Sequence, residues 1–460
     1  MQLSELKLND KVIYDYFKED LIGRNKSVIK FINYLNAINT NCSIAIDGRW
    51  GSGKTIFVKE CQMIINQLND FIPSNEEINN EDLKLNIRCS TENHMELDIK
   101  PQIAIYYDAW ENDDEEPILS LLYEICRTPY CDPNFFKTRN IIDIANEICK
   151  LVNGKDFSNL FESLKGDDNL TSVKQSKGLK ELINDFFNSL LPEQGERLVV
   201  FIDELDRCKP SFSVEFLEKI KHYFCNDKIT FVFSINSEEL QHTIKKYYGE
   251  SFDGYKYLSK LFDLYIELPK ANLTNYYHAL NLKNESKSAH FIIDSVFTKY
   301  NFQLREIRKF MILYNIIMCN KNVDNMLYSL ENAYNFAMVF IVPILIALKI
   351  TDVNAYDDFV DGKNSGYFSE ILEEYQLTTH GLTVLLDENE SYIDKENYIK
   401  VTKKEKLEKL YYTIFARNDI SYKGYNVGKV FVYKNTKKDI LEAVSLLADF
   451  SDIKIDEEHD

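Results

Sequence analysis

The stretch Gly48-Arg49-Trp50-Gly51-Ser52-Gly53-Lys54-Thr55 decides the fold of this chain. It matches G-x-x-x-x-G-K-[ST], the pattern of the phosphate-binding P-loop. Backbone N–H groups of such a loop surround a polyphosphate, and its glycines let the chain turn sharply and approach closely. We expect Lys54 to reach the β- and γ-phosphates and the Thr55 hydroxyl to bind Mg²⁺. The residues expected to bind the nucleotide here are Gly48, Trp50, Gly51, Ser52, Gly53, Lys54, Thr55 and Ile56.

The sequence on either side of the loop has the context that the motif requires. Residues 42–46 are typical of a short buried strand. After the loop, apolar residues recur at helical spacing, namely Ile56, Phe57, Cys61, Ile64, Ile65 and Leu68. A strand, a glycine-rich turn and a helix place the phosphates at a helix N-terminus. The alternative, a glycine-rich turn that binds nothing, fits these flanks poorly.

A second chemical centre follows the uninterrupted apolar run 198–202, which is typical of a central parallel strand. The run ends in Asp203-Glu204-Leu205-Asp206-Arg207, a Walker B motif in a P-loop protein. Asp203 is expected to hold Mg²⁺, directly or through water. Glu204 is expected to face the γ-phosphate and polarise the attacking water, with Lys54 and Asp203 as the other catalytic residues. A solvated acidic turn is the alternative.

The two acidic-turn residues beyond Glu204 have separate expectations. Asp206 lies further from the strand end, so we expect it to fix the turn or to pair with Arg207. Arg207 could also serve the site of a neighbouring subunit.

Strands and helices alternate along the first 270 residues. The expected strands are 42–47, 103–108, 198–203, 229–235 and 264–268, the last being an edge strand closed by Pro269. This order predicts an α/β fold, a doubly wound parallel five-stranded sheet with helices on both faces. A strand lies between the P-loop helix and the Walker B strand in the sequence. It suggests the additional-strand class of P-loop NTPases, in which a catalytic Glu follows the Walker B Asp.

Four further polar residues are candidates for contact with the nucleotide. Ser234 and Asn236 end the fourth strand, where either could sense the γ-phosphate or make a local turn bond. Arg24 could lie beside the adenine or be a surface charge. Arg305, which we prefer over Arg308, opens an amphipathic helix and could reach the phosphates from a helical lid; a surface salt bridge is its alternative.

The length of 460 residues suggests about three domains. We expect a helical linker beside the nucleotide at 1–40, a core at 41–270, a helical lid at 271–350 and an accessory α+β region at 351–460. Within the core, 71–100 is expected to be a loop insertion and 127–190 a helical insertion. The accessory region is expected to contain a strand at 430–433, a helix to 450 and an acidic tail at 456–460.

Composition narrows the class of protein. The formal net charge of −19 argues against a protein that coats nucleic acid non-specifically, and a local basic groove stays open as an alternative. The nine cysteines lack a C-x-x-C pair and are typical of reduced thiols in the cytoplasm. Asn9, Asp10 and Lys11 interrupt any signal-peptide core. The uncharged run 336–348 is shorter than the 20 or so residues that a spanning helix needs, so we expect a buried core helix and no transmembrane segment.

Four motifs together resemble the KAP family of P-loop NTPases, over about residues 20–320. They are Gly48–Thr55, Asp108-Ala109-Trp110, Phe201–Cys208 and Tyr257-Leu258-Ser259-Lys260. The resemblance implies a STAND-like ATPase acting as a switch or scaffold, and many bacterial members resemble phage-exclusion or defence proteins. Some members carry transmembrane helices between the Walker motifs, but this chain has no apolar run of 20 residues between 56 and 198.

The chain departs from the family pattern at three positions. The family commonly has Asn where Asp108 stands, a second Asp where Glu204 stands and Asp where Asn236 stands. Glu204 strengthens the case for hydrolysis.

Three functions compete. The first is an ATP- and Mg²⁺-dependent switch whose partner is an unidentified protein, an effector or a second copy of the chain. The second is a nucleotide-binding interaction module with little turnover. The third is a GTPase, which usually needs an N-K-x-D-like loop after a strand. The nearest match, residues 436–439, lies far beyond the sheet, so a GTPase is disfavoured.

Overall fold

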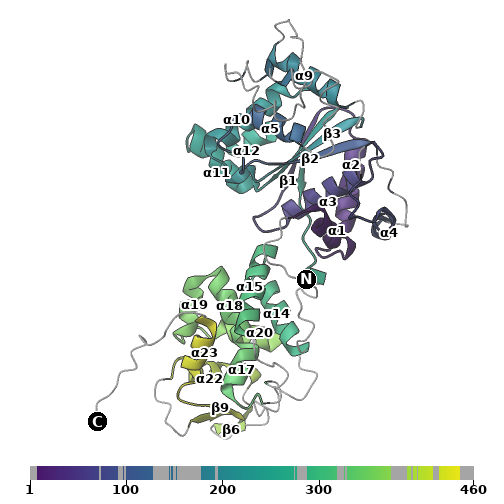
Figure 1. Cartoon of the computed structure of the whole chain (residues 1–460). Helices are drawn as coiled ribbons and strands as arrows, with labels where there is room; N and C mark the ends of the chain where they lie inside the picture. The colour runs from purple at the N-terminus through teal and green to yellow at the C-terminus, as the bar shows by residue number, and fades with distance from the viewer. Residues whose placement is uncertain are drawn as a thin grey trace. The chain divides into compact units, whose positions relative to one another are not determined.

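The structure is a computed structural model, and the chain divides into two units, Met1–Ala279 and Leu280–Asp460 (Figure 1). The residues that the structure describes are 8–71, 74–91, 97, 100–127, 144–145, 147–148, 152, 178–191, 195–273, 275–276, 287–318, 326, 329–374, 391–394, 397–400, 402–417 and 424–445. Most of the expected helical insertion at 127–190 and the acidic tail at 456–460 lie outside them.

A five-stranded parallel sheet is the centre of the first unit, as predicted. Its strands are β1 (Cys42–Asp47), β2 (Gln102–Asp108), β3 (Arg197–Asp203), β4 (Ile229–Ile235) and β5 (Leu264–Glu267). The order across the sheet is β2-β3-β4-β1-β5, so β5 is an edge strand as expected. The strand that separates the P-loop strand β1 from the Walker B strand β3 is β4. An additional strand between the P-loop strand and the Walker B strand was expected and is present. The expectation was based on β2, however, and β2 lies at the edge of the sheet opposite β5.

Helices cover both faces of this sheet (Figure 1). One face packs against α1 (Asp10–Lys18), α2 (Asn25–Ala37), α3 (Lys54–Gln67) and α4 (Asn80–Ser90). The other packs against α5 (Pro117–Arg127), α9 (Leu179–Leu190), α10 (Pro210–Tyr223), α11 (Ser237–Tyr248) and α12 (Gly254–Leu261). Side chains alternate between the faces: Val199 and Phe201 of β3 belong to the first cluster, and Leu198, Val200 and Ile202 to the second.

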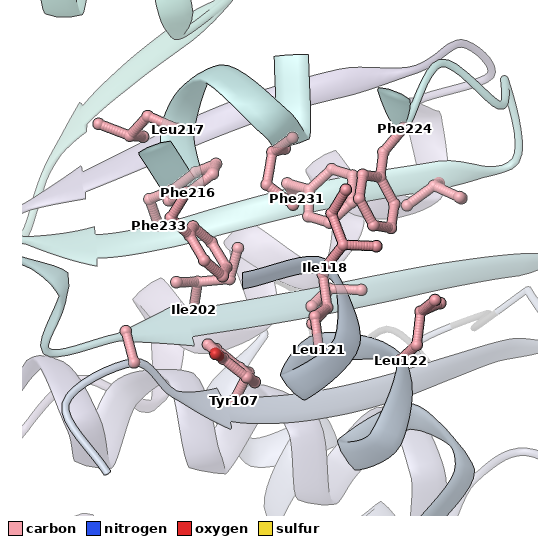
Figure 2. Packing of buried hydrophobic residues seen from close by; sticks show 14 of the residues in the cluster. Tyr107, Ile118, Leu121, Leu122, Ile202, Phe216, Leu217, Phe224, Phe231 and Phe233 are labelled. Carbon is pink, nitrogen blue, oxygen red and sulfur yellow. The ribbon is translucent and has the colours of Figure 1, made fainter. Parts of the chain in front are cut away.

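Aromatic side chains fill the second face. Figure 2 shows Phe216 and Leu217 of α10 against Phe233 of β4 and Tyr107 of β2. The rings of Tyr107 and Phe216 stack with centroids 5.3 Å apart. The Tyr107 hydroxyl is buried but hydrogen-bonds the Ser120 hydroxyl at 2.7 Å, so it keeps a polar partner. This packing fixes β2, β3 and β4 side by side, and these strands carry the acidic and polar residues at their carboxyl ends.

The expected loop at 71–100 is wrong in part, because it contains α4. Asn79 caps this helix by accepting the N–H groups of Glu81 and Asp82. Leu83 and Ile87, four residues apart, are its buried side chains. Its apolar residues Leu83, Leu85 and Ile87 alternate with polar ones, which is not a helical spacing, and this explains why the sequence did not predict the helix.

The second unit is mainly helical, as expected. Its helices are α14 (Lys287–Lys299), α15 (Leu304–Ile317), α17 (Ala333–Phe340), α18 (Val342–Thr351), α19 (Val353–Val360), α20 (Gly366–Glu374), α22 (Lys403–Phe415) and α23 (Thr436–Ser445). Two antiparallel hairpins add β6 (Ser391–Asp394) with β7 (Asn397–Lys400) and β8 (Tyr425–Val427) with β9 (Val430–Val432). The expected strand at 430–433 is β9, and the helix after it is α23.

The apolar run 336–348 is buried as expected, but it forms two helices. Pro343 sits in the first turn of α18 and lacks the N–H that would continue α17. In the described ranges, no single helix is long and apolar enough to cross a membrane. The pair α17–α18 reaches the required length and composition only together, with a bend of 45° between its members.

Candidate nucleotide-binding site

The P-loop connects β1 to α3 with the geometry that its sequence predicts. Gly51 and Gly53 have φ values of +79° and +88°, in the left-handed region that favours glycine. An added Cβ at Gly48 would lie 2.9 Å from the Ser52 hydroxyl, so a larger residue there would displace the Ser52 side chain. The helix α3 begins at Lys54, so the N–H groups of its first turn, including Ile56, face the loop. These features build an anion-binding cradle.

Lys54 folds back over the loop that precedes it. Its ammonium donates to the Gly48 carbonyl at 2.7 Å and lies 3.4 Å from the Arg49 carbonyl. Only 7% of the residue is exposed. Burial lowers the pKa of Lys54, and nearby carboxylates oppose the shift, Asp206 first and Asp203 next. The Lys54 ammonium therefore lies against the loop that would surround the phosphates.

Thr55 and Asp203 meet at the expected metal position. The Thr55 hydroxyl donates to Asp203 Oδ2 at 2.6 Å, and Asp203 is 1% exposed. The Tyr106 hydroxyl of β2 donates to the same oxygen at 3.1 Å. Mg²⁺ typically takes one or two carboxylates plus phosphate oxygens and waters, so this hydroxyl–carboxylate pair fits it. Among the described residues, no group of three or more His, Cys, Asp or Glu could hold a metal ion.

Glu204 follows β3 in a backbone conformation that is rare for its type. Its φ and ψ are 60° and 19°, the left-handed region, where non-glycine residues are uncommon. Glu204 Oε2 pairs with Arg207 Nε at 2.7 Å, and about a fifth of each side chain is exposed. The pKa of Glu204 is raised to about 7, chiefly by burial and next by Asp203, with Arg207 opposing. Outlying backbone geometry of this kind is concentrated at functional sites.

Asp206 does not pair with Arg207, so that part of the expectation is wrong. Its carboxylate accepts the indole N–H of Trp50 from the P-loop, while Arg207 turns to Glu204. Burial raises the pKa of Asp206, against the charge of Lys54 and the indole hydrogen bond. Asp206 therefore ties the Walker B turn to the P-loop, a contact between segments 156 residues apart.

Arg24 reaches the P-loop from the turn before α2. Its Nη1 donates to the Ser52 carbonyl at 2.8 Å, and 4% of the residue is exposed. The surface-charge alternative for Arg24 is therefore wrong. Burial lowers the pKa of Arg24 to about 10, and the buried Glu60 of α3 opposes the shift. Arg24 fixes the backbone of the loop, and its contact with adenine stays a prediction.

The two sensor candidates occupy different positions. Ser234 lies in β4 opposite Asp203 of β3 and Ile46 of β1, and its hydroxyl is buried without a hydrogen-bond partner. The Ser52 hydroxyl of the P-loop is also buried and unpartnered. Asn236 is the residue before α11, and its side chain makes no capping hydrogen bond. Two orphan hydroxyls beside the cradle fit a bound polar group, because buried polar atoms normally have partners.

Arg305 lies in the first turn of α15 in the second unit, and its side chain is exposed. Its predicted contact with the γ-phosphate stays a prediction. The structure brings the P-loop residues, Arg24, Asp203, Glu204 and Ser234 to one edge of the sheet.

Two residues of this edge were missed by the sequence reasoning. Tyr106 binds the metal-site carboxylate, and Asp47 binds the N–H and hydroxyl of Ser237 at 2.8 Å each, capping α11. Tyr106 lies two positions before the strand end and so shares a face with Asp108. That alternation was the available signal for Tyr106. For Asp47, the available signal was a polar residue at the end of a buried strand, directly before the P-loop.

The comparison with known families agrees with this geometry. The model of the KAP family P-loop domain matches residues 24–318, which is more than half of the chain. No curated protein matches the chain. The match spans every strand of the sheet together with the P-loop and the Asp203–Glu204 motif. The chain therefore belongs to the KAP family of P-loop NTPases.

Proposed function

We propose that the protein binds ATP with Mg²⁺ and hydrolyses it as a molecular switch. One observation carries the proposal: Lys54, Thr55, Asp203 and Glu204 meet at the carboxyl edge of the sheet beside a glycine cradle. Membership of the chain in a family of P-loop NTPases supports nucleotide binding. The charged side chains of Lys54, Asp203 and Glu204 support hydrolysis.

Each residue of the site has a role in this proposal. The P-loop N–H groups and Lys54 bind the β- and γ-phosphates, and Thr55 and Asp203 hold the metal ion. Mg²⁺, when bound, neutralises charge on the phosphate oxygens. Glu204 orients the attacking water and accepts its proton. Arg24 keeps the Ser52 carbonyl turned toward itself and so away from the phosphates.

A second function, an interaction module with little turnover, is favoured by a specific contact. The Glu204 carboxylate is paired with Arg207, which competes with any water for the same oxygen. Release of Glu204 would then depend on a partner or on the nucleotide itself. The family resemblance supports a STAND-like switch or scaffold, and a role in bacterial phage defence in the cytoplasm is part of the proposal. An unidentified effector or a second copy of the chain is the proposed partner.

The test compares binding with turnover in the purified full chain. Calorimetry with Mg²⁺-ATP and Mg²⁺-GTP measures affinity, and phosphate release measures hydrolysis. We expect tight binding of ATP, weak competition by GTP and measurable phosphate release. Binding without release in the presence of cell extract would support the interaction module, and a preference for GTP would support the GTPase. Absence of binding to both nucleotides would overturn the proposal.

A further inference from the structure

We propose that Arg207 is a positioning residue that couples the P-loop to Glu204 through the side chains of Trp50 and Trp110. The inference rests on the proposed function, since it takes Glu204 as the group that activates water. Three contacts meet on this one guanidinium. It pairs with Glu204 through Nε at 2.7 Å, and its Cζ lies 5.9 Å from the Trp50 ring and 5.5 Å from the Trp110 ring. Both ring distances lie within the range of cation–π attraction.

The two tryptophans come from different parts of the site. Trp50 belongs to the P-loop, and Trp110 to the turn after β2. They are the chain's two tryptophans, and 42% and 53% of their surfaces are exposed. Large aromatic side chains are usually more deeply buried, so the position of both rings close to Arg207 calls for a reason. Holding a planar guanidinium in one orientation is such a reason, because a guanidinium stacks on aromatic faces.

Each tryptophan is itself held in place. The Trp50 indole N–H donates to Asp206, on the same turn as Arg207. The Asp108 carboxylate accepts the N–H groups of Trp110 and Glu111 at 3.0 and 3.1 Å and so fixes the second turn. The Ala109 N–H donates to the Asp203 carbonyl at 3.0 Å, which joins that turn to β3. Arg207 is thus positioned by two segments, the P-loop after β1 and the turn after β2.

This arrangement links occupancy of the loop to the carboxylate of Glu204. Trp50 lies between Gly48 and Gly51, so a phosphate that adjusts the loop moves the indole. The indole contacts Arg207 on one side and Asp206 on the other, and Arg207 sets the side-chain direction of Glu204. An ordinary ion pair three residues apart would hold Glu204 without any such link and would contribute little. The two descriptions predict different responses of Trp110 to a bound nucleotide: a change in its surroundings if Arg207 couples the loops, and no change if Arg207 only pairs with Glu204.

The kinetic test compares Arg207→Ala, Arg207→Lys and the control Lys246→Ala. Lys246 is an exposed lysine near the end of α11. We expect Arg207→Ala to lower kcat about 10- to 100-fold, as misplacement of a reacting group does, with KM changed less than about threefold. Arg207→Lys should recover part of this loss, because it keeps the charge but not the planar stack. Lys246→Ala should match the parent.

The spectroscopic test does not need turnover. Trp50→Phe keeps an aromatic ring for Arg207 and leaves Trp110 as the single tryptophan, which is excited selectively at wavelengths beyond the tyrosine absorption; AMP-PNP with Mg²⁺ is the probe. We expect the probe to shift Trp110 emission, and adding Arg207→Ala should abolish this shift while calorimetry still shows binding. A shift that persists without Arg207 would overturn the inference.

If the parent binds nucleotide but never hydrolyses it, the proposed ATPase fails, whereas the emission result still decides the coupling. If Arg207→Ala does not fold, the same comparison is made with Arg207→Lys, which should weaken the shift, and an unchanged shift would overturn the inference.

Discussion

Lys54 is an unusual residue because it is a nearly buried cation in a cluster of carboxylates. Burial lowers the pKa of Lys54, and the negative charges of Asp206, Asp203 and Glu204 oppose that change. The carboxylates in turn have raised pKa values at Glu204 and Asp206. The site is therefore a balanced set of charges, in which loss of one member disturbs the others.

Replacing Lys54 with Ala should weaken ATP binding about 10- to 150-fold. A charge-assisted hydrogen bond to phosphate contributes about 1.5–3 kcal/mol, which corresponds to that range. The fold should survive, because Gly48 keeps its bond to the Ile235 carbonyl and Arg24 keeps the Ser52 carbonyl. Calorimetry with Mg²⁺-ATP is the measurement, and Lys26→Ala, an exposed charge in α2, is the control. Equal affinity of the Lys54 variant and the parent would remove the P-loop assignment.

Replacing Glu204 with Gln should abolish most turnover and leave ATP binding close to that of the parent. The amide keeps the shape but cannot accept the proton, and loss of a general base typically costs about 10²–10⁴ in rate. Asp206→Asn should be milder, since an amide oxygen can still accept the Trp50 indole N–H. Phosphate release and calorimetry on both variants are the measurements. If only Asp206→Asn loses turnover, Asp206 and not Glu204 is the base.

At the scale of secondary structure, the sequence predicted correctly the strands that are buried along their whole length. The strands β3 and β4 are buried at every position, and their apolar runs predicted them correctly. The helix α4 was missed because it buries only Leu83 and Ile87. The contacts between Trp50 and Asp206 and between Tyr106 and Asp203 were also missed. They depend on strand order and on which face each side chain takes, and local periodicity does not carry that information.

The helix α3 carries a buried acid whose titration should be visible in stability. Glu60 is 3% exposed, and burial raises its pKa well above the usual range, with Asp20 adding and Arg24 opposing. The folded state therefore holds the proton more tightly than the unfolded chain, whose glutamate has a pKa near 4.5. Stability from this group is complete below that pH and falls as the pH rises above it.

Glu60→Gln should remove this dependence, because an amide does not titrate. The variant should melt at a higher temperature than the parent at pH 8, and the difference should shrink toward pH 5. Thermal unfolding between these pH values is the measurement, with exposed Glu76→Gln as the control. Parallel curves for Glu60→Gln and the parent would mean that Glu60 is ionised and stabilised by Arg24.

At the scale of the whole molecule, the family match crosses the boundary between the two units. It ends at residue 318, beyond Ala279, and so includes α14 and α15. A nucleotide-binding domain that extends into a second unit fits a switch, in which the ligand favours one arrangement of two parts. A ligand shifts such an equilibrium only through contacts that differ between the two states. The exposed Arg305 at the start of α15 is a candidate for such a contact.

Arg305→Ala therefore tests the switch directly. If Arg305 reaches the γ-phosphate, its loss should weaken ATP by about tenfold or more, the effect of one charge-assisted hydrogen bond, and leave ADP nearly unchanged. Arg308→Ala is the matched control, because it removes the same charge one turn further along the helix. Calorimetry with both nucleotides is the measurement. Equal effects on ATP and ADP would assign Arg305 to the surface. A loss with Arg308→Ala instead would move the contact by one turn, and the second unit would still respond to the γ-phosphate.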